Sequence, residues 1–463
     1  MKRFILSIAA LGMTAVASAQ EAITPDVLRL LQAGEASSSV ADKALRNAMA
    51  RTSVAVLASD MSALQMGDTH FTYEVPVRSV TDQQSSGRCW LFTGMNVLRH
   101  KAARMHNMRD LELSQVYLFF WDQLEKSNLF LQGVIDTRNL PMDDRLVDWL
   151  FQNPLSDGGT FCGVYDLARK YGVVPREAMP ETYSSNHTAQ ISMLLKWKLR
   201  EMALRYRTMG EEGKSLRQIE AQKVEDLKTV WHILTLAYGV PPATFTWTQR
   251  DDKDKVVSSR EYTPQEFYET FMDTSADYVM VMNDPLREYY KVYEIDYDRH
   301  TYDGRNWTYL NLPADEIKPL AVASLRDTVA MYFSCDVGKY LNRENGTLDL
   351  RNFDYESLLG TTFGMNKRER ILTHASASSH AMTLIGVDID TLTNRIEKWE
   401  IENSWGKTSG WNGKLIMTDP WFDEYMFRLV IDTRYVPAKY LDMYRQKPIR
   451  LPAWDPLFAS GDE

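Results

Sequence analysis

The stretch QQSSGRCWLF, residues 83–92, contains one of only three cysteines in a chain of 463 residues. Apolar residues recur from Cys89 onward at the spacing of one helix face, which predicts a helix with Cys89 at or near its N-terminus. The unpaired backbone N–H groups of a helix N-terminus stabilise a thiolate, which is a strong nucleophile. Cys89 is therefore a candidate nucleophile, and the alternative is a small buried thiol.

A cysteine nucleophile needs a base, and the chain has only eight histidines. His380 opens the alternating segment HAMTLIGV, and Asn403 ends the next one, RIEKWEIEN. If the two segments form a hairpin with symmetrical pairing about the turn DTLTN, His380 lies opposite Asn403. Direct cross-strand partners have Cβ atoms roughly 4.5–5.5 Å apart, close enough for an asparagine oxygen to orient an imidazole. The alternatives are a structural histidine and a simple turn.

The spacing of apolar residues predicts the helices and strands that must position these residues. Helical apolar spacing is present in 23–34, where Pro25 marks a helix start, and in 39–58. The region of about 190–275 is expected to be a helical insertion whose PPATFTWTQRDDKDK segment is rich in turns. Short alternating segments predict a mostly β half over about 277–435. A helical half followed by an antiparallel β half predicts an α+β fold with a cleft between them.

The first residues, MKRFILSIAALGMTAVASAQ, have the basic start, apolar run and small-residue end of a secretory signal. Residues 1–19 are therefore predicted to be a signal peptide, and the mature protein is expected to be exported to the periplasm or the extracellular space. A membrane anchor or an amphipathic first helix is the alternative, but the apolar run is short for a bilayer and the A-x-A ending suits cleavage. No later stretch reaches the ~18 uninterrupted apolar residues of a membrane span, so no membrane association is expected after cleavage.

Charge and cysteine content narrow the function classes. The formal net charge is −9, which argues against a general nucleic-acid binder because such proteins need basic surface. Three cysteines cannot all be paired within one chain, so at least one thiol stays free. Cys162 and Cys335 lie among apolar neighbours and are predicted to be small buried residues rather than a bridge.

QQSSGRCWLF, HAMTLIGV and ENSWG resemble the three active-site motifs of papain-like cysteine peptidases, in that family's order of Cys, His and Asn. Cys89 and His380 are much further apart than the ~130 residues usual for the cathepsin type. The branch of bleomycin hydrolase and bacterial aminopeptidase C is the more similar one. The stretches that resemble it include LELSQVYLFFWDQLEKSN, NPLSDGGTF, KYGVVPREAMPETY, CDVGKY, MTDPWFDEYMF and LPAWDPL.

This resemblance implies a two-lobed papain-like fold and a thiol aminopeptidase that acts on peptides without a metal or cofactor. It implies that Cys89 is the nucleophile, His380 the general base and acid, and Asn403 the residue that orients the imidazole. It also implies that the side-chain amide of Gln83 joins the backbone N–H of Cys89 in the oxyanion hole. Gln84 is the alternative donor.

Further residues take supporting roles by the same resemblance. Trp405 is expected to cover the contact between histidine and asparagine, and Trp90 to pack the helix start, although both could be plain core residues. Gly158 and Gly159 are expected to let a substrate backbone approach closely, although SDGGT could be only a turn.

The resemblance also implies a C-terminal arm, about 450–463, that enters the cleft so that the terminal carboxylate of Glu463 meets the free amine of the substrate. Phe458 and Asp462 depart from the small-residue tail of the family, and the predicted export departs from its usual cytosolic location. Members of the branch form homohexamers, so a homo-oligomer is expected. Two alternatives are an endopeptidase with an open cleft and a catalytically silent binding or assembly shell.

Overall fold

The structure is a computed structural model that describes residues 22–35, 39–60 and 68–457. The predicted signal peptide, residues 1–19, and the predicted substrate-binding residue Glu463 lie outside the described residues. Both remain predictions from the sequence.

The chain divides into two compact units, residues 1–59 with 354–360 and residues 60–353 with 361–463. The described part of the first unit is helical, and a capping box at Ser39 starts its second helix. The predicted helix over 39–58 is in fact two helices. The helices of this unit are α1 (Pro25–Glu35), α2 (Val40–Met49), α3 (Val54–Ala58) and α13 (Tyr355–Leu359).

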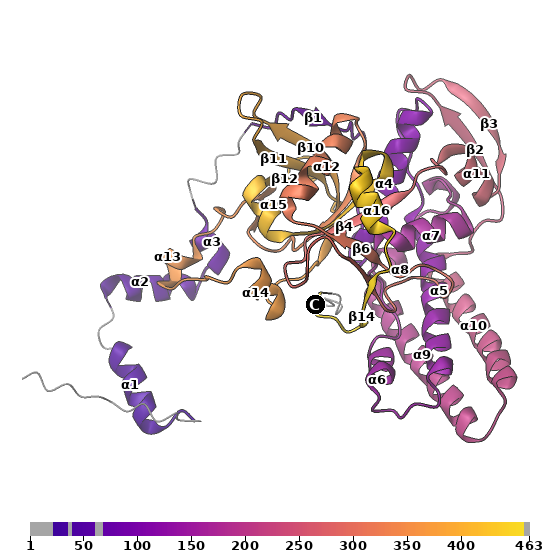
Figure 1. Ribbon diagram of the computed structural model, residues 1–463, viewed down its shortest axis with the longest axis horizontal. Coiled ribbons are helices and arrows are strands. Elements are labelled where there is room, and N and C mark those ends of the chain that lie inside the picture. Colours follow the sequence, from indigo (N-terminus) through magenta and orange to yellow (C-terminus); the bar gives the residue numbers. More distant parts are fainter. Residues whose placement is uncertain (1–21, 36–38, 61–67, 458–463) are drawn as a thin grey trace, which may run out of the picture. The chain divides into compact units, whose positions relative to one another are not determined.

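The second unit begins with a helical part in which α5, α9 and α10 pack side by side (Figure 1). Ser114 caps α5, Asp144 caps α6, and a capping box at Ser215 starts α10. Gly239 ends α10 at a φ of 90°, which only glycine adopts readily. The helices are α4 (Cys89–Met105), α5 (Gln115–Asp136), α6 (Arg145–Gln152), α7 (Phe161–Tyr171), η1 (Arg176–Ala178), α8 (Tyr183–Asn186), α9 (Thr188–Glu211) and α10 (Leu216–Tyr238).

The segment predicted to be rich in turns is instead an antiparallel hairpin of β2 (Phe245–Arg250) and β3 (Val256–Tyr262), followed by α11 (Pro264–Phe271). The alternating aromatics explain the difference, since Phe245 and Trp247 both point to one buried side. There they pack edge-on against α11, and the ring centroid of Trp247 lies 5.1 Å from that of a phenylalanine in this helix. Only the polar residues between the two strands form a turn.

Within the described residues, 12 strands form one large sheet, mostly antiparallel, in the order β14-β5-β6-β4-β13-β7-β10-β11-β12-β9-β8, with β1 pairing to β10. The strands are β1 (Tyr73–Glu74), β4 (Tyr278–Met282), β5 (Val292–Ile295), β6 (Thr308–Asn311), β7 (Met331–Cys335), β8 (Leu341–Asn342), β9 (Thr347–Leu348), β10 (His380–Ile389), β11 (Ile396–Glu402), β12 (Lys414–Thr418), β13 (Met426–Asp432) and β14 (Ile449–Leu451).

The sheet separates two hydrophobic cores. Along β7, Tyr332 belongs to the core shared with the helical part, whereas Met331 and Phe333 belong to the core on the other side. Strand alternation thus buries both faces of the central strands. The remaining helices of the second unit are α12 (Ala314–Arg326), α14 (Lys367–Leu372), α15 (Asp419–Tyr425), η2 (Thr433–Tyr435) and α16 (Ala438–Tyr444). The predicted α+β class is confirmed.

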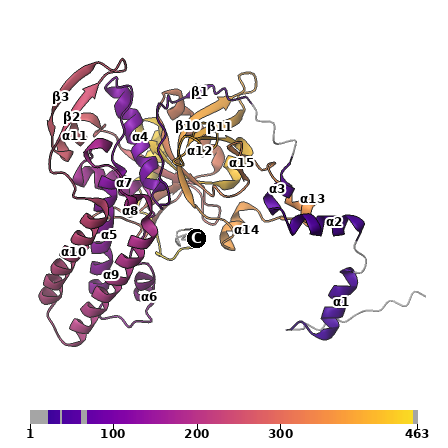
Figure 2. The same ribbon diagram turned by 180° about the vertical axis from the view of Figure 1, so that it is seen from behind.

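Helix α4 contacts β10 and β7, and Figure 2 shows it beside the sheet that includes β10. The first residue of α4 meets the start of this strand, since the backbone N–H of Ala381 donates to the Cys89 sulfur. The hairpin of β10 and β11 is present, but its predicted register was wrong by two residues, because Thr383 pairs with Glu402 and not with Glu400. The pair closest to the turn, Ile389 with Ile396, already has this shift, so the turn is centred one residue later than predicted. The two irregularities within the hairpin cancel each other.

Candidate active site

Cys89 is the first residue of α4 and is half-buried. The preceding Arg88 is fully buried, and its guanidinium pairs with Glu181 at 2.8 Å, which fixes the chain at the helix start. Burial raises the pKa of the Cys89 thiol to about 11, while the backbone N–H groups of Ala381 and Trp90, which donate to the sulfur, oppose that rise. Because Ala381 directly follows His380, its contact places the sulfur beside the predicted base.

His380 and Asn403 meet as predicted: Nε2 of the imidazole lies 2.9 Å from Oδ1 of the asparagine, and both side chains are buried. The same oxygen accepts the backbone N–H of Ser404 at 2.8 Å, so Asn403 is held in a fixed orientation. An oxygen acceptor at Nε2 assigns the proton to that nitrogen and leaves Nδ1 free to act as the base. The contact survives the register shift because Asn403 lies just beyond the end of β11.

Burial lowers the pKa of His380 to about 4, and the hydrogen bond to Asn403 opposes this shift. A thiolate alone and an imidazolium alone are therefore both disfavoured in this site. The two groups must ionise together, with the proton passing from the Cys89 sulfur to the imidazole rather than to solvent. The positive end of α4 favours this exchange because it stabilises the sulfur anion.

Gln83 is buried and held at both ends of its side-chain amide. Its Nε2 donates to the carbonyl of Ser86 at 2.7 Å, and its Oε1 accepts from the hydroxyl of Ser404 at 2.6 Å. Within the described residues no acceptor takes its second N–H, so that proton can serve an oxyanion. Gln84, the alternative donor, is exposed and has a φ of 53°. The geometry favours Gln83.

Trp405 covers the imidazole as predicted, since its ring centroid lies 4.9 Å from that of His380. The backbone N–H of Gly406 donates to the carbonyl of Thr81 at 3.1 Å, which ties the ENSWG segment to the loop that carries Gln83. The base, its orienting residue and the oxyanion donor are thus linked through one short segment.

The glycine pair lies beside Trp90, which is buried and donates from Nε1 to the carbonyl of Asp157 at 2.8 Å. A Cβ at Gly159 would lie 2.2 Å from a ring carbon of His300 and 2.8 Å from Trp90. Internal packing therefore already requires glycine at 159. A Cβ at Gly158 would approach only a serine hydroxyl, at 3.2 Å, so this position is the more open of the two.

Sequence reasoning missed the polar network under this loop. His300 is buried, its Nδ1 lies 2.5 Å from a carboxylate oxygen of Asp122, and its Nε2 accepts the backbone N–H of Thr160. Lys126 pairs with the same carboxylate and donates to the carbonyl of Gly158 at 2.5 Å. No motif in the sequence signals this network, whereas Ser404, which was also missed, lies inside ENSWG.

The structure has Cys162 and Cys335 as buried free cysteines, as predicted. Burial raises the pKa of both thiols, and unlike the half-buried Cys89 both are closed off from solvent. Cys335 pairs with His380 across β7 and β10 and so forms part of the wall behind the site.

Among the residues that the structure describes, no group of three or more His, Cys, Asp or Glu side chains is arranged to hold a metal ion. No helix in that part of the chain is long and apolar enough to cross a membrane.

The model of the Peptidase C1-like family matches residues 23–458. Bleomycin hydrolase of Homo sapiens is 37% identical over 412 residues, which cover 87% of this chain and 90% of that protein. Aminopeptidase C of Lactobacillus delbrueckii subsp. lactis is 35% identical over 398 residues, 85% of this chain and 88% of that protein. A crystal structure of PepW from Lactobacillus rhamnosis HN001 matches with a TM-score of 0.90 and 34% identity, covering 94% of this chain and 99% of the other.

Proposed function

Since the chain belongs to the Peptidase C1-like family, we propose that it is a thiol aminopeptidase that releases N-terminal residues from peptides. The resemblance to the papain-like branch of bleomycin hydrolase and aminopeptidase C is confirmed, and so is the papain-like fold. The observation that carries the proposal is the hydrogen bond between His380 and Asn403 beside a cysteine at a helix N-terminus.

The proposed chemistry has two halves. In the first, the Cys89 sulfur attacks the carbonyl carbon of the N-terminal residue, and His380 takes the thiol proton and then gives it to the leaving amine as the C–N bond breaks. In the second, water attacks the thioester, His380 removes its proton, and the sulfur leaves and is protonated again. Gln83 and the backbone N–H of Cys89 donate to the oxyanion formed in each half.

We further propose that the C-terminal arm limits the enzyme to free N-termini. The described end of the arm is anchored: β14 pairs with β5, Arg287 pairs with Asp455, and Leu457 is buried. Residues 458–463 follow directly from this anchor. A carboxylate in the cleft would attract the substrate's α-ammonium group and exclude chains that extend beyond it.

Export and assembly are also proposals. The signal-like residues 1–19 support export to the periplasm or beyond. A homo-oligomer, a hexamer by resemblance, is supported by exposed apolar side chains on α9 and α10, among them Trp197 at 60% and Leu236 at 75%. Light scattering of the purified protein measures the assembly size, and a monomer would contradict the proposal.

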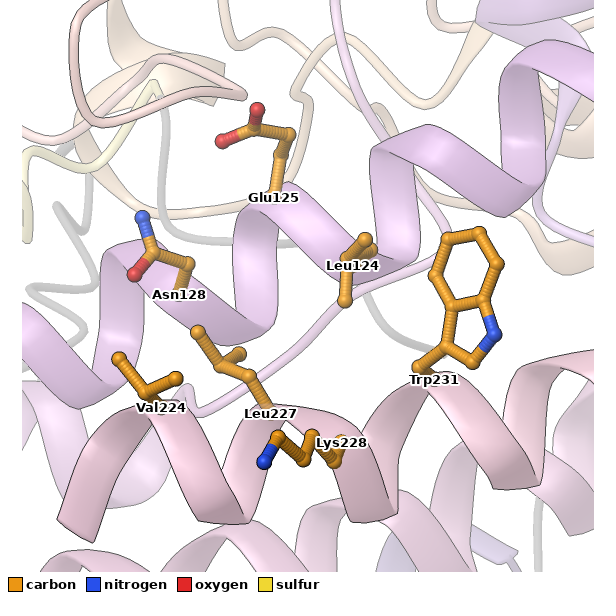
Figure 3. A pocket seen from close by; sticks show the side chains of 7 residues that line it. All are labelled: Leu124, Glu125, Asn128, Val224, Leu227, Lys228 and Trp231. Carbon is orange, nitrogen blue, oxygen red and sulfur yellow. The ribbon is translucent and has the colours of Figure 1, made fainter. Parts of the chain in front are cut away.

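A groove between α5 and α10 adds to this exposed surface. Figure 3 shows Leu124 on one helix facing Leu227 and Trp231 on the other, and the groove has a volume of about 480 Å³. It contains none of the candidate catalytic residues, so it supports packing between copies rather than chemistry. Its lining residues are Leu124, Glu125, Asn128, Val224, Leu227, Lys228 and Trp231.

The test of the activity compares alanyl-aminomethylcoumarin, which has a free amine, with its N-acetylated form, under reducing conditions. The aminopeptidase hydrolyses the free-amine substrate and spares the acetylated one. Faster cleavage of the acetylated substrate would favour the endopeptidase alternative. No cleavage of either substrate, or of a peptide mixture, would favour the silent shell.

A further inference from the structure

An exposed arginine lies beside the active site on an element that the chemistry has not used. The guanidinium of Arg343 lies 4.6 Å from the ring centroid of Trp405, and this ring in turn covers His380 at 4.9 Å. An arginine over a tryptophan face is a favourable cation–π contact. Two successive ring contacts thus connect Arg343 to the imidazole.

The position of Arg343 is fixed by its turn. It lies between β8 and β9, which pair with each other, and β9 also pairs with β12. The side-chain oxygen of Asn342 accepts the backbone N–H groups of Glu344 and Asn345 at 3.0 and 3.3 Å. Hydrogen bonds therefore hold the backbone of the turn that carries the guanidinium, although the side chain is exposed.

The charge of Arg343 is available to a ligand. Within the described residues, no carboxylate forms an ion pair with it. Its positive charge also opposes protonation of His380, although burial is the larger cause of the lowered pKa of this histidine. A carboxylate that bound here would neutralise a cation that now disfavours the imidazolium.

The reaction decides which part of a substrate meets this arginine. In the proposed mechanism His380 protonates the leaving amine, so the peptide beyond the scissile bond must lie on the imidazole side of Cys89. Trp405 and Arg343 flank that side. A carboxylate of the first residue after the scissile nitrogen stays within roughly 2.5–5 Å of that nitrogen by covalent geometry, close to the covered imidazole.

We propose that Arg343, held over Trp405, binds a carboxylate of the leaving group, either the terminal carboxylate of a dipeptide or an acidic side chain directly after the scissile bond. The inference rests on the proposed aminopeptidase function and adds a preference to it. The leaving peptide is selected by charge at the same time as the tryptophan face accepts its apolar part.

The experiment measures ratios of kcat/KM in two arms. The first compares Ala-Ala with Ala-Ala amide, and the second compares Ala-Asp-Leu amide with Ala-Asn-Leu amide. The wild type prefers the carboxylate in at least one arm by about 2- to 5-fold at low salt, the range of an exposed ion pair, and 0.5 M NaCl reduces the preference. The arm that shows the preference identifies the source of the carboxylate.

Three variants test the assignment. Arg343→Gln lowers the ratio to about 1, and Arg343→Lys retains part of it because the charge remains. Arg395→Gln removes the same charge at the far end of the hairpin of β10 and β11 and leaves the ratio as in the wild type.

Two results would overturn the inference. One is a ratio near 1 in both arms of the wild type. The other is an unchanged ratio in Arg343→Gln, and if both substrates then lose activity equally, the arginine only supports Trp405. Cleavage of alanyl-aminomethylcoumarin by the wild type is measured first. If that cleavage is absent, the proposed function itself fails. If the enzyme is active but its kcat/KM ratio of carboxylate to amide substrate is near 1, only the role of Arg343 is refuted.

Discussion

Replacing Gln83 by alanine tests the proposed oxyanion hole. The structure gives this side chain one spare N–H, aimed by the hydroxyl of Ser404 at its Oε1 and by the carbonyl of Ser86 at its Nε2. Loss of one oxyanion donor costs about 2.7–4 kcal/mol of transition-state stabilisation, so kcat for alanyl-aminomethylcoumarin should fall by about 10²–10³. The substitution also leaves the buried hydroxyl of Ser404 without its acceptor, which lowers the free energy of unfolding by about 1–3 kcal/mol.

The assay must separate these two effects. Urea unfolding gives the stability of Gln83→Ala, and the kinetics are then measured well below the urea and temperature at which it unfolds. The matched control is Gln84→Gly, which removes the neighbouring exposed amide without strain, because glycine accepts the φ of 53° at this position. Gln84→Gly should match the wild type. A folded Gln83→Ala enzyme within 3-fold of the wild type, or an equal loss in Gln84→Gly, would refute the reasoning.

Three further predictions concern the base, the arm and the fold. Asn403→Ala should lower kcat/KM by about 10- to 100-fold relative to the wild type, which is a smaller loss than in His380→Ala, because packing against Trp405 still holds the imidazole. Equal rates in Asn403→Ala and wild type would remove the asparagine from the mechanism. Deleting residues 458–463 should raise cleavage of the N-acetylated substrate and weaken the preference for a free amine, with assembly size checked in parallel. If a correctly assembled truncated enzyme keeps its preference, another acidic group binds the amine. Burial alone would raise the pKa of Asp432, but hydrogen bonds from arginine and lysine lower it to about 2. Since this folded value is below the unfolded one, Asp432→Asn should lower the free energy of unfolding by roughly 1–2 kcal/mol above pH 4. This loss of stability should shrink as the pH falls from 4 towards 2. A deficit that does not change over this pH range would contradict the assignment.

The candidate site could be predicted from the sequence where it depends on local signals. The helical spacing after Cys89 located the helix start, and the alternating segments around His380 and Asn403 located their hairpin. The register failed because the hairpin turns one residue later than the predicted centre, which shifts the pairs by two or three residues. Asn403 still meets His380 because it lies past the end of its strand.

Contacts between distant segments could not be predicted in the same way. The turn that carries Arg343 reaches Trp405 only through the pairing of β9 with β12, and His300 reaches the glycine loop from a segment with no recognisable motif. The hairpin of β2 and β3 was missed because its turn residues outweighed the alternation of its aromatics. The division of the chain into two units depends on packing, which periodicity does not report.

The most direct test of the central claim is the activity of Cys89→Ala. A small side chain at a helix start costs little stability, so this variant should unfold at nearly the same temperature as the wild type and yet show no measurable hydrolysis of alanyl-aminomethylcoumarin. Cys162→Ala, which removes a buried thiol outside the site, should remain active. Substantial hydrolysis by purified Cys89→Ala would contradict the account, because the nucleophile would then lie elsewhere.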